Sequence, residues 1–405
     1  MAQAGVDPLR HYLRHGRAEG RLPCFMTAAW RERDLRWGLL EDGAAALQRL
    51  AHHGRGADRV WAALACARVA GRQGDWEAAW TWLEPLDPAT ELIGGFCLPD
   101  PALLAIETAL MAGHPNQAQR IWEQAARFFG RTPDLRLAAA NITAQEQGFG
   151  AAWSRDMSRL YRRSGLDGVL VAPASGALAQ MEAFDRLQPM ASIFGAYRRR
   201  GGPLVSVIMP AFNAATTIVT ALRSLRDQSW QNLEILVVDN GSTDSTADVV
   251  RSLIARDPRI QLLDGGNEPG TYGARNLGVA AARGEFITVL DADDWAHPAR
   301  IRRQVRALLR RPDRVASMSH WVRTTPDLRF TRWWREDGLT HLDVSSLMIR
   351  REARAQLGFW DRARAAADTE YYYRIQAHFG MSSIYQVLPG VPLSFGRVRP
   401  QSLTQ

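Results

Sequence analysis

The stretch Phe286-Ile-Thr-Val-Leu-Asp-Ala-Asp-Asp294 decides the fold of this chain, because a short apolar run ends there in a cluster of acids. A second stretch has the same design, since the apolar run at 235–238 ends at Asp239. In an open α/β sheet, the loops that leave the carboxyl ends of the strands line the ligand crevice. We therefore expect both sets of acids to meet at one site, although Asp239 and Asp293 are 54 positions apart in the sequence.

The segment from Leu204 onward alternates short apolar runs with amphipathic stretches. The pattern predicts strands at 205–209, 234–238, 260–263 and 286–290. It predicts helices at 215–228, 245–256, 272–282 and 298–311. Strands that alternate with amphipathic helices indicate an α/β fold with a mostly parallel, twisted, Rossmann-like sheet.

The first 165 residues have a different character, with Ala, Leu, Arg and Trp at helical spacing and almost no strand pattern. Weakly similar segments at 74–80, 113–122 and 148–153 begin with glycines 39 and 35 positions apart. This spacing indicates a tetratricopeptide-like array of helix pairs, with an irregular helical bundle as the alternative. We expect an α-helical domain at 1–165, a linker at 166–203 and an α/β domain at 204–405.

Composition narrows the class of protein. The chain has 405 residues, 46% of them apolar, and no run of 18 apolar residues that would span a membrane. Its first residues lack the pattern of a secretory signal, so a cytoplasmic location is expected. The three cysteines, Cys24, Cys66 and Cys97, form no Cys-x-x-Cys pair, which argues against a disulfide framework or a zinc site.

The net charge of +8 would attract anions such as phospholipid headgroups or a diphosphate-bearing substrate. No helix-turn-helix, finger or base-stacking pattern accompanies it, so nucleic-acid binding is not expected. The excess of arginine is greatest from Pro298 to Arg364. This excess is also compatible with ordinary solvated helix faces.

The acidic residues after the two apolar runs indicate which ligands the site would bind. A carboxylate at Asp239 suits the imide N–H of a uracil ring, although the Gly-Ser-Thr that follows is also typical of a helix-capping loop. Asp291, Asp293 and Asp294 repel one another unless a cation neutralises them. Mg²⁺ or Mn²⁺ would bind one or two of these carboxylates together with phosphate oxygens. The alternative is a solvated turn in which Asp294 caps the next helix.

Five stretches together resemble, in order, the motifs of family 2 inverting glycosyltransferases of the GT-A fold. The resemblance extends from about Leu204 to Gly380 and rests on 205–213, 238–246, 273–278, 284–294 and 367–370. The stretch at 7–23 also resembles an element of bacterial surface-polysaccharide glycosyltransferases. The family implies a nucleoside-diphosphate sugar as donor, with UDP as the expected nucleotide, and a divalent cation, Mn²⁺ or Mg²⁺, as cofactor.

The resemblance assigns roles to individual positions. Asp293 would bind the metal, with Asp291 as a weaker ligand near the ribose. Phe212 stands where a tyrosine is common, and Asn240 stands where many members have a second aspartate. The residues implied to contact the nucleotide sugar are Pro210, Ala211, Phe212, Asp239, Asn240, Arg275, Asp291 and Ala292.

The catalytic base of the family is usually the aspartate of a Glu-Asp pair that precedes an aromatic helix. Here the stretch is Ala367-Asp-Thr-Glu-Tyr-Tyr-Tyr-Arg374, which places Asp368 as the base, with Glu370 as the fallback. Ala367 stands at the position of the usual glutamate. Read without the family, both acids are first-turn residues that match a helix dipole.

The resemblance implies an inverting transferase that moves a sugar to a hydroxyl of a glycan or lipid-linked glycan in bacterial surface-polysaccharide synthesis. A protein partner on the helical region and peripheral membrane association are compatible with it. The alternative is a degenerate, nucleotide-binding scaffold, suggested by Asn240 and Ala367. A dinucleotide enzyme is not expected, because no Gly-x-Gly-x-x-Gly follows the first strand. The acceptor side remains open among His320, Trp321, Trp333, Trp334, Ser345 and Ser346.

Overall fold

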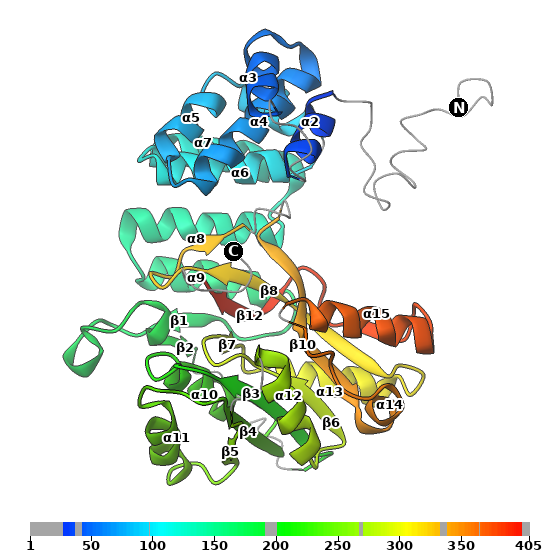
Figure 1. Ribbon diagram of the computed structural model, residues 1–405. Helices are drawn as coiled ribbons and strands as arrows, with labels where there is room; N and C mark the ends of the chain where they lie inside the picture. The colour runs from blue at the N-terminus through cyan, green and yellow to red at the C-terminus, as the bar shows by residue number, and fades with distance from the viewer. Residues whose placement is uncertain are drawn as a thin grey trace. The chain divides into compact units, whose positions relative to one another are not determined.

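The computed structural model describes residues 27–36, 43–96, 98–190, 201–266, 270–332, 338–363 and 365–398. The chain divides into two compact units, one within residues 1–135 and one within 136–405 (Figure 1). Among the helices in these described ranges, none has the length and apolar character needed to cross a bilayer. Cys24, Cys97 and the stretch at 7–23 lie outside the described residues.

The first unit is helical, as predicted, and helices adjacent in sequence pack together. Cys66 is buried in this unit. Burial is the main cause that raises the pKa of its thiol to about 11, and the nearby Glu32 carboxylate adds to the effect. The elements are α2 (Thr27–Arg36), α3 (Gly43–His53), α4 (Gly56–Arg72), α5 (Trp76–Leu83), a π-helical turn (Pro88–Ile93), α6 (Asp100–Met111) and α7 (Pro115–Phe129).

The three glycines of the weak sequence repeat lie in turns between consecutive helices. Gly74, Gly113 and Gly148 adopt φ values of 79°, 81° and 69°, in the region that favours glycine. They separate α4 from α5, α6 from α7, and α8 (Pro133–Gln147) from α9 (Ala151–Arg162). The repeat therefore marks helix pairs, and the third pair lies almost entirely in the second unit.

The second unit is built on a ten-stranded sheet of order β5-β4-β3-β6-β10-β8-β12-β7, with β9 and β11 also paired to β8. The first four of these strands are parallel, and β10 joins β6 antiparallel. The strands are β3 (Val205–Ala211), β4 (Leu233–Asp239), β5 (Ile260–Asp264), β6 (Phe286–Val289), β7 (Trp295–Ala296), β8 (Ala316–Thr324), β9 (Phe330–Thr331), β10 (Thr340–Arg350), β11 (Ile384–Gln386) and β12 (Pro392–Arg397).

All four strands predicted from the alternation are confirmed to within two residues at each end, and so is the α/β class. The four predicted helices are present with shorter or shifted ends. The helices of the sheet are α10 (Ile218–Arg226), α11 (Thr246–Ile254), α12 (Gly270–Ala281), α13 (Arg300–Arg310), α14 (Arg351–Leu357) and α15 (Ala367–Phe379). The strands from β8 onward, which pair in both parallel and antiparallel orientation, have no clear counterpart in the sequence pattern.

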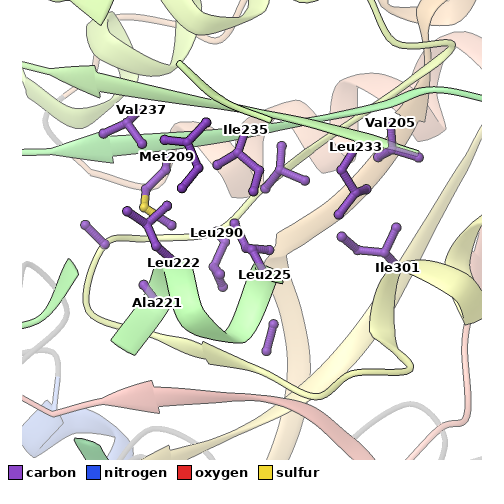
Figure 2. Close-up of a cluster of buried hydrophobic side chains, with 14 of the residues drawn as sticks. Val205, Met209, Ala221, Leu222, Leu225, Leu233, Ile235, Val237, Leu290 and Ile301 are labelled. Carbon is purple, nitrogen blue, oxygen red and sulfur yellow. The ribbon is translucent and has the colours of Figure 1, made fainter. Parts of the chain in front are cut away.

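Both faces of β3, β4 and β6 are buried, which explains the apolar runs of these strands, whereas the edge strand β5 is partly exposed. Val205, Val207 and Met209 of β3 belong to one core together with side chains of α10 and α13 (Figure 2). Ile208 of the same strand belongs to the opposite core, with side chains of α12 and α15. At Gly278 of α12, an added Cβ would lie 2.4 Å from Ile208, so glycine lets this helix approach the sheet closely.

Residues 136–190 are also part of the second unit. The side-chain amide of Asn141 in α8 donates to the carbonyl of Phe330 at 2.7 Å and accepts from its backbone N–H at 2.9 Å. Tyr161 at the end of α9 is buried and donates its hydroxyl to the carbonyl of Pro392 at 2.9 Å. Next comes the hairpin of β1 (Val169–Val171) and β2 (Leu187–Pro189), with 3₁₀ turns at Gly176–Leu178 and Phe184–Arg186.

We predict that Asn141→Ala destabilises the second unit, because the buried N–H and C=O of Phe330 lose their partner. The expected loss of unfolding free energy is roughly 2–4 kcal/mol, measured by urea denaturation. Gln145→Ala, an exposed change in the same helix, serves as the control and leaves stability nearly unchanged. Equal stability of the two variants would show that α8 is not an integral part of this unit.

A second prediction concerns pH. Buried His297 donates from Nε2 to the carbonyl of Asp167 at 3.0 Å and accepts at Nδ1 from the N–H of Ala299 at 3.1 Å. Burial lowers its pKa to about 4 from the ordinary 6.5, and Arg302 and Arg303 contribute in the same direction. The neutral ring is therefore favoured in the folded protein. Its contribution to stability is present above pH 6.5 and is lost as the pH falls toward 4.

We expect the native protein to lose on the order of 2–3 kcal/mol of unfolding free energy from this residue across that window. His297→Gln should flatten the pH dependence, whereas the exposed His378→Gln should not. Denaturation curves at pH 7, 5.5 and 4.5 give the comparison. An identical slope in all three proteins would contradict the assignment.

Candidate active site

The loops after β3 and β4 are joined by hydrogen bonds that shape one side of the site. Asn213 accepts from the N–H of Thr243 at 2.8 Å and donates its own N–H to the hydroxyl of Ser242 at 3.0 Å. Its φ of 48° is left-handed, a conformation that asparagine tolerates better than most residues. The N–H of Ala214 donates to the hydroxyl of Thr246 at 2.8 Å. Ser242 and Thr246 therefore connect two loops, and their role is more than helix capping.

These hydrogen bonds fix the positions of the first group of residues that the sequence predicts to contact the nucleotide sugar. Ala211 lies opposite Asp239 in the β3–β4 register, and the N–H of Asn240 donates to the carbonyl of Ala211 at 2.9 Å. Asp239 is half-buried at the end of β4 and accepts from the N–H of Ser242 at 3.1 Å. Phe212, which follows β3, exposes 61% of its surface. The planar apolar side chain of Phe212 therefore lies one residue beyond the end of β3, next to the Ala211 that is paired with Asp239.

The second group of residues follows β6. Asp291 accepts two hydrogen bonds from one guanidinium nitrogen of Arg275, at 2.7 and 3.1 Å. Arg275 comes from α12 and is buried. Burial alone would lower its pKa, but the charges of Asp291 and then Asp368 outweigh burial and raise it. Since β3 separates β4 from β6, the ends of β4 and β6 lie about 10 Å apart along the same sheet edge.

Negative charge is concentrated after Asp291. Burial is the largest cause that raises the pKa of Asp294 well above its usual range, followed by repulsion from Asp293, Asp291 and Asp343. Asp294 accepts from the backbone N–H of Arg397 at 3.1 Å. It does not cap α13, which begins at Arg300. The turn at 291–294 therefore differs from the solvated, helix-capping turn that the sequence offers as the alternative.

The donor atoms of this cluster suit a hard divalent cation, which prefers carboxylate oxygen. The half-buried Asp293 and Asp291 are the residues that would bind it, and the ion pair with Arg275 makes Asp291 the weaker ligand. Across the described ranges, no group of three or more His, Cys, Asp or Glu side chains is arranged to hold a metal ion. Two carboxylates fit an ion whose remaining ligands come from phosphate oxygens and water.

One cation is built into the protein beneath the acid cluster. Arg300 is buried and donates to the carbonyl of Val289 at 2.6 Å and to the hydroxyl of Thr288 at 3.2 Å. Burial lowers its pKa, while the charges of Asp343, Asp294 and Asp291 oppose this effect. Sequence reasoning assigned no role to Arg300 or Asp343, because each is separated from the acid motif and belongs to a regular helix or strand.

Asp368 lies in the first turn of α15 and faces α12. Its Oδ1 accepts from the hydroxyl of Tyr272 at 3.1 Å and from the N–H of Thr369 at 2.8 Å, and its Oδ2 accepts from the hydroxyl of Ser345 at 3.3 Å. Ala366 immediately precedes the helix with a φ of 64°, a left-handed conformation that is unfavourable for alanine. Such local strain is frequent at functional sites.

Glu370, the fallback for the base, has a different environment. It forms an ion pair with Arg374, with nitrogen–oxygen distances of 2.8 and 2.6 Å. Arg374 also pairs with Asp361 at 2.8 Å and donates to the carbonyl of Phe359 at 2.8 Å. Glu370 is thus part of a surface ion-pair network that connects α15 to the preceding loop.

Arg397, the last residue of β12, is anchored inside the second unit. Its side chain is buried and forms an ion pair with Asp185, which also accepts from the hydroxyl of Thr220 at 2.6 Å. Arg399 lies outside the described residues.

On the proposed acceptor side, Ser346 is structural. Its hydroxyl donates to the carbonyl of Asp343 at 2.7 Å, and its N–H donates to the Asp343 carboxylate at 3.0 Å. Ser345 contacts Asp368 as described above. His320 and Trp321 are half-buried in β8. The remaining candidates, Trp333 and Trp334, lie outside the described residues.

Comparison with known proteins agrees with this geometry. The family described as "Glycosyl transferase family 2" matches residues 206–366. The succinoglycan biosynthesis protein ExoO of Rhizobium meliloti is 42% identical over 103 residues, which are 25% of this chain and 29% of ExoO. An Escherichia coli protein named UDP-Glc:alpha-D-GlcNAc-diphosphoundecaprenol beta-1,3-glucosyltransferase is 35% identical over 102 residues, 25% of this chain and 40% of that protein.

Among solved structures, residues 1–349 of Staphylococcus aureus TarS align with a TM-score of 0.39 and 17% identity, covering 48% of this chain and 60% of that one. The chain spans less than half the length of these curated relatives. The matched segment nevertheless contains Asp239, Arg275, Asp291 and Asp293, and ends just before Asp368. The segment at 206–366 is therefore a domain of the glycosyltransferase family 2 type.

Proposed function

We propose that the protein is an inverting, metal-dependent glycosyltransferase that transfers a sugar from a nucleoside-diphosphate sugar, with UDP as the nucleotide, to a hydroxyl of a glycan or lipid-linked glycan. The observation that carries the proposal is the convergence of the acid cluster after β6 and Asp368 on α12. Arg275 of that helix pairs with Asp291, and Tyr272 of the same helix bonds Asp368. Donor-binding and proton-accepting groups are therefore held by one helix turn.

The donor side is supported by the loop geometry after β3 and β4. The carboxylate of Asp239 can accept the imide N–H of uracil, with the exposed ring of Phe212 nearby to cover the base. Pro210, Ala211, Asn240 and Ala292 would border the nucleotide through backbone and short side chains. The UDP specificity named for the Escherichia coli relative makes UDP-glucose the first donor to test.

The metal would be held by Asp293, with a smaller contribution from Asp291. When bound, Mn²⁺ or Mg²⁺ supplies positive charge that stabilises the diphosphate as a leaving group. The protein contributes the fixed positions of the carboxylates and the buried charge of Arg300 below them. Burial raises the pKa of the neighbouring Asp294, and repulsion from Asp293, Asp291 and Asp343 adds to this effect.

The reaction is a single displacement. The acceptor oxygen forms a bond to the anomeric carbon, its proton passes to an Asp368 oxygen, and the bond to the diphosphate breaks with its electron pair on the leaving oxygen. One displacement inverts the anomeric configuration. Asp368 is favoured over Glu370 because Glu370 is engaged by Arg374.

The relatives suggest an acceptor substrate and a cellular location, and both belong to this proposal. A diphosphoundecaprenol-linked sugar, the acceptor in the name of the Escherichia coli relative, is the first acceptor to test. A lipid-linked acceptor would bring the enzyme to the inner face of the cytoplasmic membrane as a peripheral protein. The helical first unit would bind a protein partner. Its tetratricopeptide-like helix pairs would form the binding surface.

The base assignment predicts that Asp368→Asn lowers turnover by about 10²–10⁴-fold, because the amide cannot accept the acceptor proton. Turnover is measured as UDP release from a panel of UDP-sugars with Mn²⁺ and the lipid-linked acceptor. Calorimetric affinity for UDP should be unchanged. Glu370→Gln is the matched control and should retain turnover. The opposite pattern would assign the base to Glu370.

The metal assignment predicts that Asp293→Ala weakens binding of UDP in the presence of Mn²⁺ by at least about tenfold, because the ion loses its principal protein ligand. Isothermal calorimetry with and without Mn²⁺ measures the effect. Asp313→Ala removes an exposed carboxylate distant in sequence from the motif and should bind as the native protein does. Equal affinities for all three proteins would reject Asp293 as a ligand.

A further inference from the structure

We infer that Tyr272 is a positioning residue for the base, and that its hydroxyl holds the Asp368 carboxylate in the orientation needed to receive the acceptor proton. The inference deepens the proposed function and rests on it. It assigns a role to a residue that lies outside the acid motifs, in the helix between β5 and β6.

The first observation is the hydrogen bond itself. The phenol of Tyr272 donates to Oδ1 of Asp368 at 3.1 Å across 96 positions of sequence. Tyr272 is buried, and its ring is fixed in the core formed by α12, α15 and the sheet. A donor that is held on a buried ring has little freedom to move, so it defines where the carboxylate oxygen lies.

The second observation is the division of the carboxylate between two sets of donors. Oδ1 is occupied by Tyr272 and by the N–H of Thr369 at 2.8 Å, whereas among the described residues Oδ2 has only the longer contact with Ser345 at 3.3 Å. The better-bonded oxygen anchors the group. The less engaged oxygen, Oδ2, is therefore the atom that we assign to the acceptor proton.

The third observation is that the phenol stays protonated. Burial is the largest cause that raises the pKa of Tyr272 to about 12, and the charge of Asp368 adds to it. The hydroxyl thus remains a donor at every pH at which such an enzyme works. The charged group that faces this pair from the same helix is Arg275, whose guanidinium carbon lies 5.1 Å from the Tyr272 ring centroid.

Arg275 extends the connection to the donor side. The same guanidinium that lies near the Tyr272 ring holds Asp291. Glu370, the other acid at the start of α15, is paired with Arg374 and does not compete for Tyr272. A single turn of α12 therefore sets the separation between the proposed metal-binding loop and the proposed base.

The test is Tyr272→Phe, which removes the hydroxyl and keeps the ring in the core. We expect kcat for UDP release from UDP-glucose, with Mn²⁺ and the lipid-linked acceptor, to fall roughly tenfold with little change in KM for the donor. The acidic limb of the pH–rate profile should move to higher pH, because loss of a donor to the carboxylate favours its protonated form. Tyr373→Phe, the same change at an exposed position of α15, should alter neither quantity.

A stability measurement tests the contact without relying on turnover. Tyr272→Phe and Asp368→Asn should shift the unfolding midpoint non-additively when combined, since each removes the same hydrogen bond. Additive shifts would overturn the contact. An unchanged pH–rate limb together with unchanged kcat would overturn the positioning role, and so would a change confined to KM.

The two hypotheses fail in different ways. If native protein releases no UDP from any UDP-sugar and binds no UDP with Mn²⁺, the proposed function fails and the inference fails with it. If native protein is active and Asp368→Asn is inactive while Tyr272→Phe behaves as native, the inference alone is wrong.

Discussion

The ion pair between Arg275 and Asp291 is the interaction on which the arrangement of the site depends. The guanidinium of Arg275 is buried, and the charge of the Asp291 carboxylate stabilises it there. The carboxylate lies at the end of β6, and the arginine lies in α12. The pair therefore joins the edge of the sheet to the helix that covers it. Gly278, one turn further on, allows that helix to approach β3 closely enough for the pair to form.

The charges of three further residues near this pair, Arg300, Asp343 and Asp294, influence one another although Asp343 is distant from the other two in the sequence. Arg300 places a permanent cation below the acid cluster without forming an ion pair in the described part of the chain. Burial raises the pKa of Asp343, and Arg300 opposes that effect. Burial, followed by repulsion from Asp293, Asp291 and Asp343, raises the pKa of Asp294 well above its usual range. A divalent cation held by the cluster, as proposed, would supply additional positive charge at this edge of the sheet.

The sequence was sufficient to predict the parallel half of the sheet, because strands buried on both faces appear as continuous apolar runs. It also predicted that Asp239 and the acids from Asp291 onward would follow two strands of that sheet at the same edge. It did not predict the mixed half of the sheet, since β8 and β10 alternate polar and apolar residues irregularly and their register shifts between Asp343 and Met348. Tyr272 was missed as a partner of Asp368 because a hydrogen bond across 96 positions leaves no local pattern.

The helix pair α8–α9 has a practical consequence for work on fragments of this chain. Its hydrogen bonds to Phe330 and Pro392 make it part of the unit that carries the acids, although its repeat pattern resembles the preceding helices. A fragment that begins at residue 204, where the first family motif starts, would leave those backbone groups facing solvent and expose the ring of Phe330. Truncation boundaries and domain exchanges are therefore better placed ahead of Pro133 than at the motif border.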